Sequence, residues 1–160
     1  MKACSSALAW MALAVCAAIA PAQTFQGRQV ASVVPSLPVA LEPGKQIEVP
    51  LQVRIRSGYH INSNKPAEEY LIPTRLSWDA APLAVKNIAY PKAEIVTYAF
   101  SEEPLSVYSG IIVLKTSFAV PKQVPATLAE LKGRLRYQAC NDKECLPPAT
   151  LEVSVPVKQP

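Results

Sequence analysis

Hydrophobic and polar residues alternate along several segments of the chain. Over residues 47–56 an apolar side chain recurs at every second position, with polar residues or Pro50 between. The same alternation occurs over residues 131–139 and 151–157. A period of two sends successive side chains to opposite faces, so each segment predicts a β-strand with one buried face. Pro50 predicts that the first of these strands lies at a sheet edge or carries a bulge.

Further strands are expected between these three. The candidate segments are residues 29–34, 71–79, 84–90 and 107–120. Sixteen prolines leave few uninterrupted stretches for a long helix, because proline lacks the backbone donor and clashes with the preceding turn. The pattern therefore predicts an all-β protein of about seven strands, arranged as a two-sheet antiparallel sandwich.

The first 22 residues have a different character from the rest. Lys2 precedes an apolar run over residues 7–20, which is shorter than the roughly 20 residues needed to cross a bilayer. Ala20, Pro21 and Ala22 then fit a small-residue cleavage site. This order predicts a secretory signal peptide at 1–22 and a single mature domain at 23–160, in the periplasm or secreted. No later segment is long and apolar enough for a membrane span.

Cys16 raises an alternative for the leader, because a cysteine after a short apolar run is the site of lipid attachment in lipoproteins. The bulky Val15 stands where a small residue would be expected and argues against it. Cleavage after residue 22 would leave 15 basic and 12 acidic residues. The basic residues form no run, and Lys132, Arg134 and Arg136 alternate as on a solvated strand face. We therefore expect no nucleic-acid partner.

The mature chain would keep two cysteines, Cys140 and Cys145, between two predicted strands. All four residues between them are polar. A strand–loop–strand corner brings two such residues within disulfide range, and an exported chain favours the oxidised form. The sequence therefore predicts a Cys140–Cys145 disulfide.

The residues alone leave open whether this bond is structural or redox-active. On the chain-entropy model, closing so small a loop contributes only about 2 kcal/mol, and a polar, accessible position favours attack by an external thiolate. Lys143 would favour a thiolate, while Asp142 and Glu144 oppose it. We therefore expect reactivity to arise from access and loop strain, without a strongly lowered pKa.

Other chemistries have less support in the sequence. Two cysteines supply half of a tetrahedral zinc site, and the single histidine, His60, is remote in sequence. A hydrolase would need a nucleophile motif or a paired-carboxylate site, and neither is evident. We therefore expect no metal and no cofactor.

Residues 137–148, with a Tyr-Gln lead, two close cysteines and a Pro-Pro exit, resemble the amino-terminal periplasmic domain of the thiol:disulfide interchange protein DsbD. Residues 58–62 and 72–74 are similar to family segments as well, and the resemblance extends from Glu42 onward. It implies an immunoglobulin-like sandwich of about seven to nine strands. The cysteine loop is one residue shorter than in the best-known members.

The resemblance also implies a function, that of a periplasmic module passing electrons between thioredoxin-fold partners by thiol–disulfide exchange. Such activity would be of the protein-disulfide reductase type. Cys145 would form the mixed disulfide and Cys140 would resolve it. The family's membrane domain and carboxy-terminal thioredoxin-like domain have no counterpart in this sequence, so a separate membrane electron donor is expected.

Five further residues are expected to line the site. By the resemblance, Phe100 lies in a loop that covers the cysteines, and His60 and Asn62 occupy positions where family members carry tyrosines. Tyr137 and Pro147 flank the cysteine loop in sequence. The alternative to the exchange function is a non-enzymatic β-sandwich binding module, in which a structural disulfide shapes residues 141–144 as a recognition loop.

Overall fold

The computed structural model describes residues 29–98 and 100–159, and the expected signal peptide lies outside them. Within the described residues the secondary structure is β-strand, with no helix. The strands are β1 (Ala31–Val33), β2 (Val39–Ala40), β3 (Gln46–Ile55), β4 (His60–Asn62), β5 (Arg75–Asp79), β6 (Ala84–Ala89), β7 (Glu94–Val96), β8 (Leu105–Tyr108), β9 (Ile111–Ala119), β10 (Glu130–Tyr137), β11 (Ala139–Cys140) and β12 (Ala149–Lys158).

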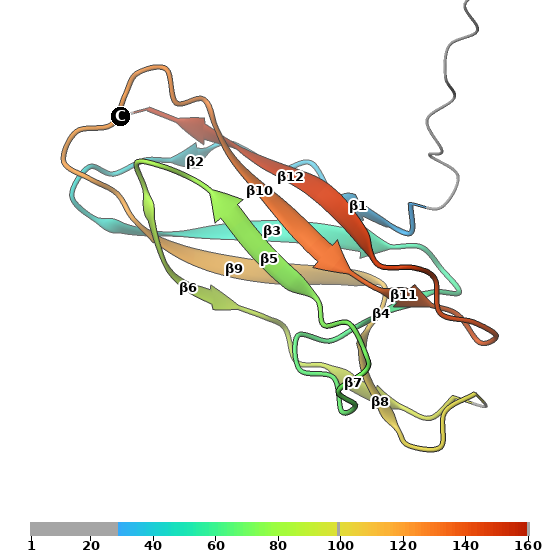
Figure 1. The fold of residues 1–160 in the computed structure, drawn as a ribbon. Helices are drawn as coiled ribbons and strands as arrows, with labels where there is room; N and C mark the ends of the chain where they lie inside the picture. Colours follow the sequence, from blue (N-terminus) through green and yellow to red (C-terminus); the bar gives the residue numbers. More distant parts are fainter. Residues whose placement is uncertain (1–28, 99, 160) are drawn as a thin grey trace, which may run out of the picture.

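These strands form three four-stranded sheets, with the orders β1-β3-β9-β6, β2-β12-β10-β5 and β11-β4-β8-β7. The first two make up the sandwich, and the third lies at the end away from the C-terminus (Figure 1). Every pairing is antiparallel except that of β2 with β12. The all-β, immunoglobulin-like prediction is confirmed. The strands outnumber the prediction because β2, β4, β7 and β11 have only two or three residues each, and because residues 107–120 hold parts of two strands, β8 and β9.

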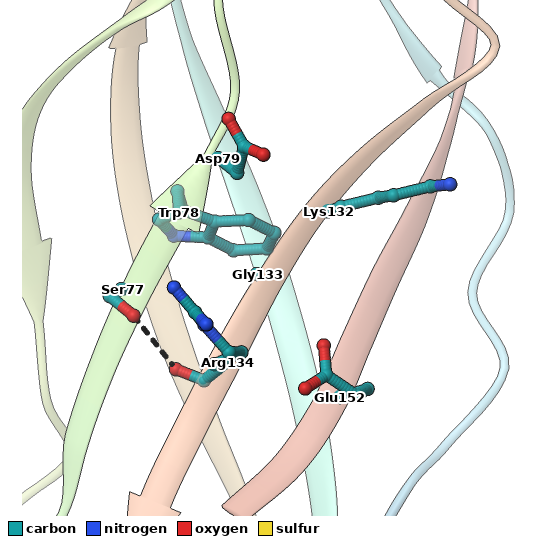
Figure 2. A pocket seen from close by; sticks show the side chains of 7 residues that line it. All are labelled: Ser77, Trp78, Asp79, Lys132, Gly133, Arg134 and Glu152. Carbon is teal, nitrogen blue, oxygen red and sulfur yellow. Dashed lines mark hydrogen bonds between the residues drawn. The ribbon is translucent and has the colours of Figure 1, made fainter.

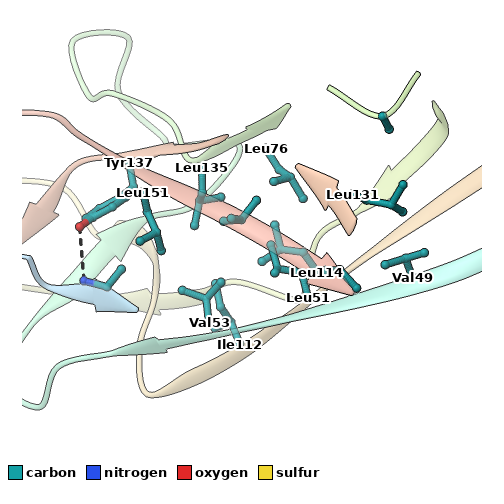
Figure 3. Close-up of a cluster of buried hydrophobic side chains, with 14 of the residues drawn as sticks. Val49, Leu51, Val53, Leu76, Ile112, Leu114, Leu131, Leu135, Tyr137 and Leu151 are labelled. Atoms are coloured by element: carbon teal, nitrogen blue, oxygen red, sulfur yellow. Dashed lines mark hydrogen bonds between the residues drawn. The ribbon is translucent and has the colours of Figure 1, made fainter. Parts of the chain in front are cut away.

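The core lies between the two large sheets and follows the alternation seen in the sequence. Exposed and buried residues alternate over all ten positions of β3, and β10 and β12 show the same pattern over most of their length. Leu51 and Leu114 from one sheet and Leu135 and Leu151 from the other belong to one cluster (Figure 3). Burying a side chain of this size contributes about 1.5–3 kcal/mol, so this cluster is the main source of the sandwich's stability.

Gly110 divides the strand that was expected over residues 107–120. Its φ of 65° lies in the left-handed region, which glycine adopts without a steric cost. β8 before it belongs to the third sheet, and β9 after it belongs to the sandwich. The Ile55 N–H donates to Gly110 O at 2.7 Å, so this turn is tied to the end of β3.

Two other expectations about strands need correction. β5 begins at Arg75, not at residue 71, because Thr74 is bonded elsewhere: its N–H donates to Ser63 O at 3.0 Å and its hydroxyl to Asn62 O. β3 lies between β1 and β9 and keeps a regular register, so the expectation of an edge strand or bulge at Pro50 was wrong. β1 pairs only with residues 53–55 of β3, so Pro50 removes no donor from that ladder.

Candidate redox site at the Cys140–Cys145 disulfide

Cys140 and Cys145 form the expected disulfide, with an S–S distance of 2.04 Å and their Cα atoms 4.0 Å apart. The two residues face each other as an antiparallel bridge. Backbone hydrogen bonds flank the pair on both sides, from Asn141 N to Glu144 O at 2.9 Å and from Leu146 N to Ala139 O at 2.8 Å. This is the arrangement of a non-hydrogen-bonded cross-strand pair, in which the Cα atoms approach most closely.

The turn between the cysteines is organised by the side chain of Asn141. Its Oδ1 accepts hydrogen bonds from the N–H groups of Lys143, at 2.8 Å, and Glu144, at 2.9 Å. Asparagine commonly stabilises turns in this way, by bonding to the backbone two or three residues further along. Asp142, Lys143 and Glu144 are all exposed. The loop is therefore a compact polar turn with its charges in solvent.

The two sulfur-bearing residues differ sharply in exposure. Cys140 is fully buried, at 0% exposure, whereas Cys145 is exposed. A thiolate from outside must reach the sulfur along the S–S axis opposite the leaving sulfur, and the exposed residue is the one that it can approach. Of the two cysteines, Cys145 is therefore the one that solvent reaches.

Gln138, directly before β11, anchors the cysteine loop to the third sheet. Its Nε2 donates to Leu146 O at 3.2 Å, and its Oε1 accepts from Asn62 Nδ2 and from Ile72 N, each at 3.3 Å. Asn62 Nδ2 also donates to Ile72 O at 3.0 Å. One amide thus joins the exit of the cysteine loop, β4 and the segment before β5.

A stack of three rings begins at His60, the register partner of Cys140. His60 stacks on Tyr98 with centroids 4.2 Å apart, and Tyr98 stacks on Phe100 at 5.4 Å. Tyr98 also packs against a small apolar cluster of Leu71, Leu105 and Val107 under the third sheet. Phe100, the outer ring, keeps 40% of its surface exposed. The stack therefore leads from a buried histidine to the protein surface.

The electrostatics of the stack connect it to the cysteine loop. Burial lowers the pKa of His60 from its ordinary value of 6.5, while the Asp142 carboxylate opposes that change. Burial also raises the pKa of Tyr98, and the charges of Asp142 and Glu94 raise it further. Asp142 acts on both rings, so the turn between the cysteines lies near the His60–Tyr98 pair.

The structure brings most of the expected residues together. His60 and Asn62 lie on β4, which pairs with β11, and His60 is the register partner of Cys140. Phe100 stacks on Tyr98, which in turn stacks on His60. Pro147 is exposed in the exit of the cysteine loop.

Tyr137 does not line the site, and that expectation needs correction. It is 1% exposed within the sandwich core, where its hydroxyl accepts a hydrogen bond from Ala31 N at 3.3 Å (Figure 3). The strand period explains this placement, because Tyr137 is in phase with the buried Leu135 of β10. Sequence reasoning missed Gln138 and Tyr98. A signal for Tyr98 existed, since Tyr98 and Phe100 stand two residues apart, but Gln138 gave none beyond its place in the Tyr-Gln lead.

A separate hollow lies on the second sheet, and neither a cysteine nor a histidine lines it. It lies between β5, β10 and β12, and Trp78 lies against Gly133 there (Figure 2). Its charges are matched across the strands, because Lys132 pairs in register with Asp79 and Arg134 with Glu152. The residues that line it are Ser77, Trp78, Asp79, Lys132, Gly133, Arg134 and Glu152.

The part of the chain that the structure describes holds no group of three or more His, Cys, Asp or Glu side chains placed to bind a metal. None of its segments is a helix of the length and hydrophobicity needed to cross a bilayer.

Comparison with known proteins places the chain in a family. The model described as "Thiol:disulfide interchange protein DsbD, N-terminal" matches residues 29–156, whereas no curated protein matches. Among solved structures, the N-terminal periplasmic domain of ScsB from Proteus mirabilis aligns with a TM-score of 0.51 and 13% identity, covering 78% of this chain and 44% of that one. The DsbD N-terminal domain of Neisseria meningitidis, in reduced form, aligns with a TM-score of 0.42 and 22% identity, covering 67% and 74%. The chain thus spans less than half of the ScsB chain. It belongs to the family of N-terminal domains of the thiol:disulfide interchange protein DsbD.

Proposed function

We propose that this chain is an exported thiol–disulfide exchange module that passes electrons between thioredoxin-fold proteins through Cys140 and Cys145. The observation that carries the proposal is the unequal exposure of two bonded cysteines, one fully buried and one exposed. A bond that served only to brace the fold would gain nothing from an accessible sulfur, whereas exchange requires one. Membership of the DsbD N-terminal family supports the same function.

The proposed chemistry needs no cofactor. In reduction, a donor thiolate attacks Cys145 Sγ, the Cys140–Cys145 bond breaks, and Cys140 leaves with the electron pair as a thiolate that takes up a proton. A second thiolate of the donor then attacks the donor sulfur of this mixed disulfide, so the donor's disulfide forms and Cys145 leaves as a thiolate that takes up a proton, which gives the dithiol. In delivery, the Cys145 thiolate attacks an acceptor disulfide and forms a mixed disulfide. Cys140 then attacks Cys145 Sγ, so the disulfide re-forms and the acceptor leaves with two electrons.

The surface around the site supports a protein partner. Three exposed apolar side chains belong to the third sheet or its connections: Tyr70 is 73% exposed, Ile95 69% and Phe100 40%. Large apolar side chains in solvent at one end of a domain favour a docking surface. We propose a thioredoxin-fold partner there and a separate membrane protein as the electron donor. The signal peptide at 1–22, the mature domain at 23–160 and a periplasmic location are parts of the same proposal.

Single-cysteine variants test the assignment. The probe is a thioredoxin-fold protein that retains one cysteine, activated as a mixed disulfide with thionitrobenzoate. Cys140→Ala should displace the thionitrobenzoate and form a stable cross-link through Cys145. Cys145→Ala is the matched control and should cross-link far more slowly, because its remaining thiol is buried. Equal rates for the two variants would contradict the roles proposed here.

The reduction potential of the parent protein separates exchange from the binding-module alternative. Exchangeable disulfides lie at about −120 to −270 mV, and structural ones in exported proteins lie below about −300 mV. Equilibration with glutathione and with dithiothreitol, followed by alkylation of free thiols, measures this value. We expect a potential between about −120 and −270 mV, and a potential below about −300 mV would favour the binding module.

A further inference from the structure

Cys145, Cys140 and His60 form one row across three neighbouring chain segments. Cys145 faces Cys140 as an antiparallel bridge, and Cys140 faces His60 in the β11–β4 ladder. Residues directly opposite each other in such a ladder point their side chains to the same face, with Cβ atoms about 4.5–5.5 Å apart. The imidazole of His60 is therefore the side chain next to Cys140 on the side away from Cys145. Only Cys145 in this row is exposed, because Cys140 is 0% and His60 3% exposed.

His60 has an unused polar atom in this position. Its Nε2 is buried and has no hydrogen-bond partner among the described residues. A buried polar group without a partner costs about 1–3 kcal/mol, so its retention at this position calls for a reason. In the disulfide form Cys140 has no proton to give and no charge to stabilise. Opening the bond changes that, because Cys140 then becomes a thiol or a thiolate beside the imidazole.

We propose that His60 is the general base for Cys140 when Cys140 resolves the mixed disulfide, a role that rests on the exchange function proposed above. The imidazole takes the proton from the Cys140 thiol. The resulting Cys140 thiolate attacks Cys145 Sγ, the bond from Cys145 to the partner breaks, and the partner sulfur leaves with the electron pair. The imidazolium then gives its proton to the departing thiolate or to water, and His60 is neutral again.

The charged and titratable groups around His60 suit this role. Tyr98 covers one face of the ring, Asp142 acts on it from the cysteine turn, and Cys140 lies beside it on β11. Burial lowers the pKa of His60 and outweighs the opposing effect of Asp142. The imidazole is therefore neutral near pH 7 and able to accept a proton. A thiolate formed beside it raises the pKa of the imidazolium in turn, because opposite charges stabilise each other.

The test uses the reduced full chain and excess 5,5′-dithiobis(2-nitrobenzoic acid). Attack by Cys145 releases one thionitrobenzoate, and resolution by Cys140 releases the second, so the two steps appear as separate phases in stopped-flow absorbance. His60→Phe keeps a ring for the stack on Tyr98 and removes both nitrogens. A thiol of pKa about 8.5 is only about 3% ionised at pH 7, so losing its base should slow the second phase by about 10- to 30-fold. The first phase should change little.

The pH profile distinguishes a base from a packing residue. At about pH 9 most of an ordinary thiol is ionised without help, so the second phases of parent and variant should converge there. A variant that only disturbed packing would stay slow at every pH. His60→Gln, which also lacks the basic nitrogen, must show the same profile, and it takes the place of His60→Phe should that variant fail to fold.

Several outcomes would overturn the proposal. The role of His60 is wrong if both variants match the parent in the second phase, or if their loss does not depend on pH. It is also wrong if Tyr98→Phe, which removes the other titratable group on the ring, gives the loss instead. A parent that releases no thionitrobenzoate would overturn the exchange function itself, so the two proposals fail in different ways.

Discussion

The side-chain amides of Asn62 and Gln138 meet at 3.3 Å, although 76 residues separate them in the chain. Gln138 Oε1 accepts from the Asn62 amide and from the Ile72 N–H, while its Nε2 donates to Leu146 O. The contact joins β4 to the residue that leads into the cysteine loop. The loop is therefore held on a fixed base and does not depend on the disulfide alone for its position.

Replacing Gln138 with alanine should loosen that base. The change leaves the Ile72 N–H and the Leu146 carbonyl without their side-chain partner, so we expect the free energy of unfolding to fall by about 1–3 kcal/mol. Urea denaturation of the oxidised protein measures this. Gln52→Ala, at an exposed position of β3, is the control and should change stability by less than about 0.5 kcal/mol. Equal effects of the two variants would show that the network carries no stability.

Gly133→Ala should destabilise the second sheet. A Cβ at this position would lie 2.5 Å from Ser77 O and 2.8 Å from Trp78 Cε3, closer than atoms can approach. β5 or the indole must shift, and overpacking of this kind costs about 1–3 kcal/mol. Thermal unfolding should show a lower Tm. The control is Thr150→Ala, an exposed position on β12 of the same sheet, and a Gly133→Ala Tm equal to that of the control would argue against a tight contact.

Tyr137→Phe should separate stability from exchange. The variant loses the acceptor for the buried Ala31 N–H, so its free energy of unfolding should be lower than the parent's by about 1 kcal/mol. The rate of thionitrobenzoate release should stay at the parental value, because the hydroxyl is buried and bonded to the backbone of β1. Slower thionitrobenzoate release with unchanged stability would indicate that Tyr137 is part of the redox site after all.

Local patterns predicted the long strands and the disulfide but not the third sheet. The period of two is readable in β3, β10 and β12 because each has eight residues or more. β4, β7 and β11 have two or three residues, too few to show a period, and they exist because distant segments pair with them. The sheet that holds the site is therefore the part of the fold that depends most on non-local contacts.

The same distinction applies to the site residues. The Cys140–Cys145 pair is predictable because the two cysteines lie only five positions apart in the sequence. Gln138 and Tyr98 act on partners far away in the chain, on Asn62 and His60 respectively, and nothing near them in sequence indicates that. Tyr137 belongs to the Tyr-Gln lead that carries the family resemblance, but the strand period places its side chain on the core face.

The stability of the protein should depend on pH through His60. Burial lowers the pKa of His60 in the folded state below the 6.5 of an exposed histidine. Between these two pKa values the unfolded chain binds a proton that the folded chain does not, so acid favours unfolding in that range. The contribution of His60 is therefore fully present above about pH 6.5, and it is lost as the pH falls toward the folded pKa.

Urea denaturation at a series of pH values checks this prediction, with His60→Phe as the comparison. The parent should lose stability relative to the variant as the pH is lowered through the range just below 6.5, because phenylalanine binds no proton in either state. The carboxylates titrate at lower pH and are common to both proteins, so the difference between the two curves isolates the histidine. Curves that stay parallel across this range would mean that His60 titrates alike in both states, and a parent that gains stability as the pH falls would mean that burial does not outweigh Asp142.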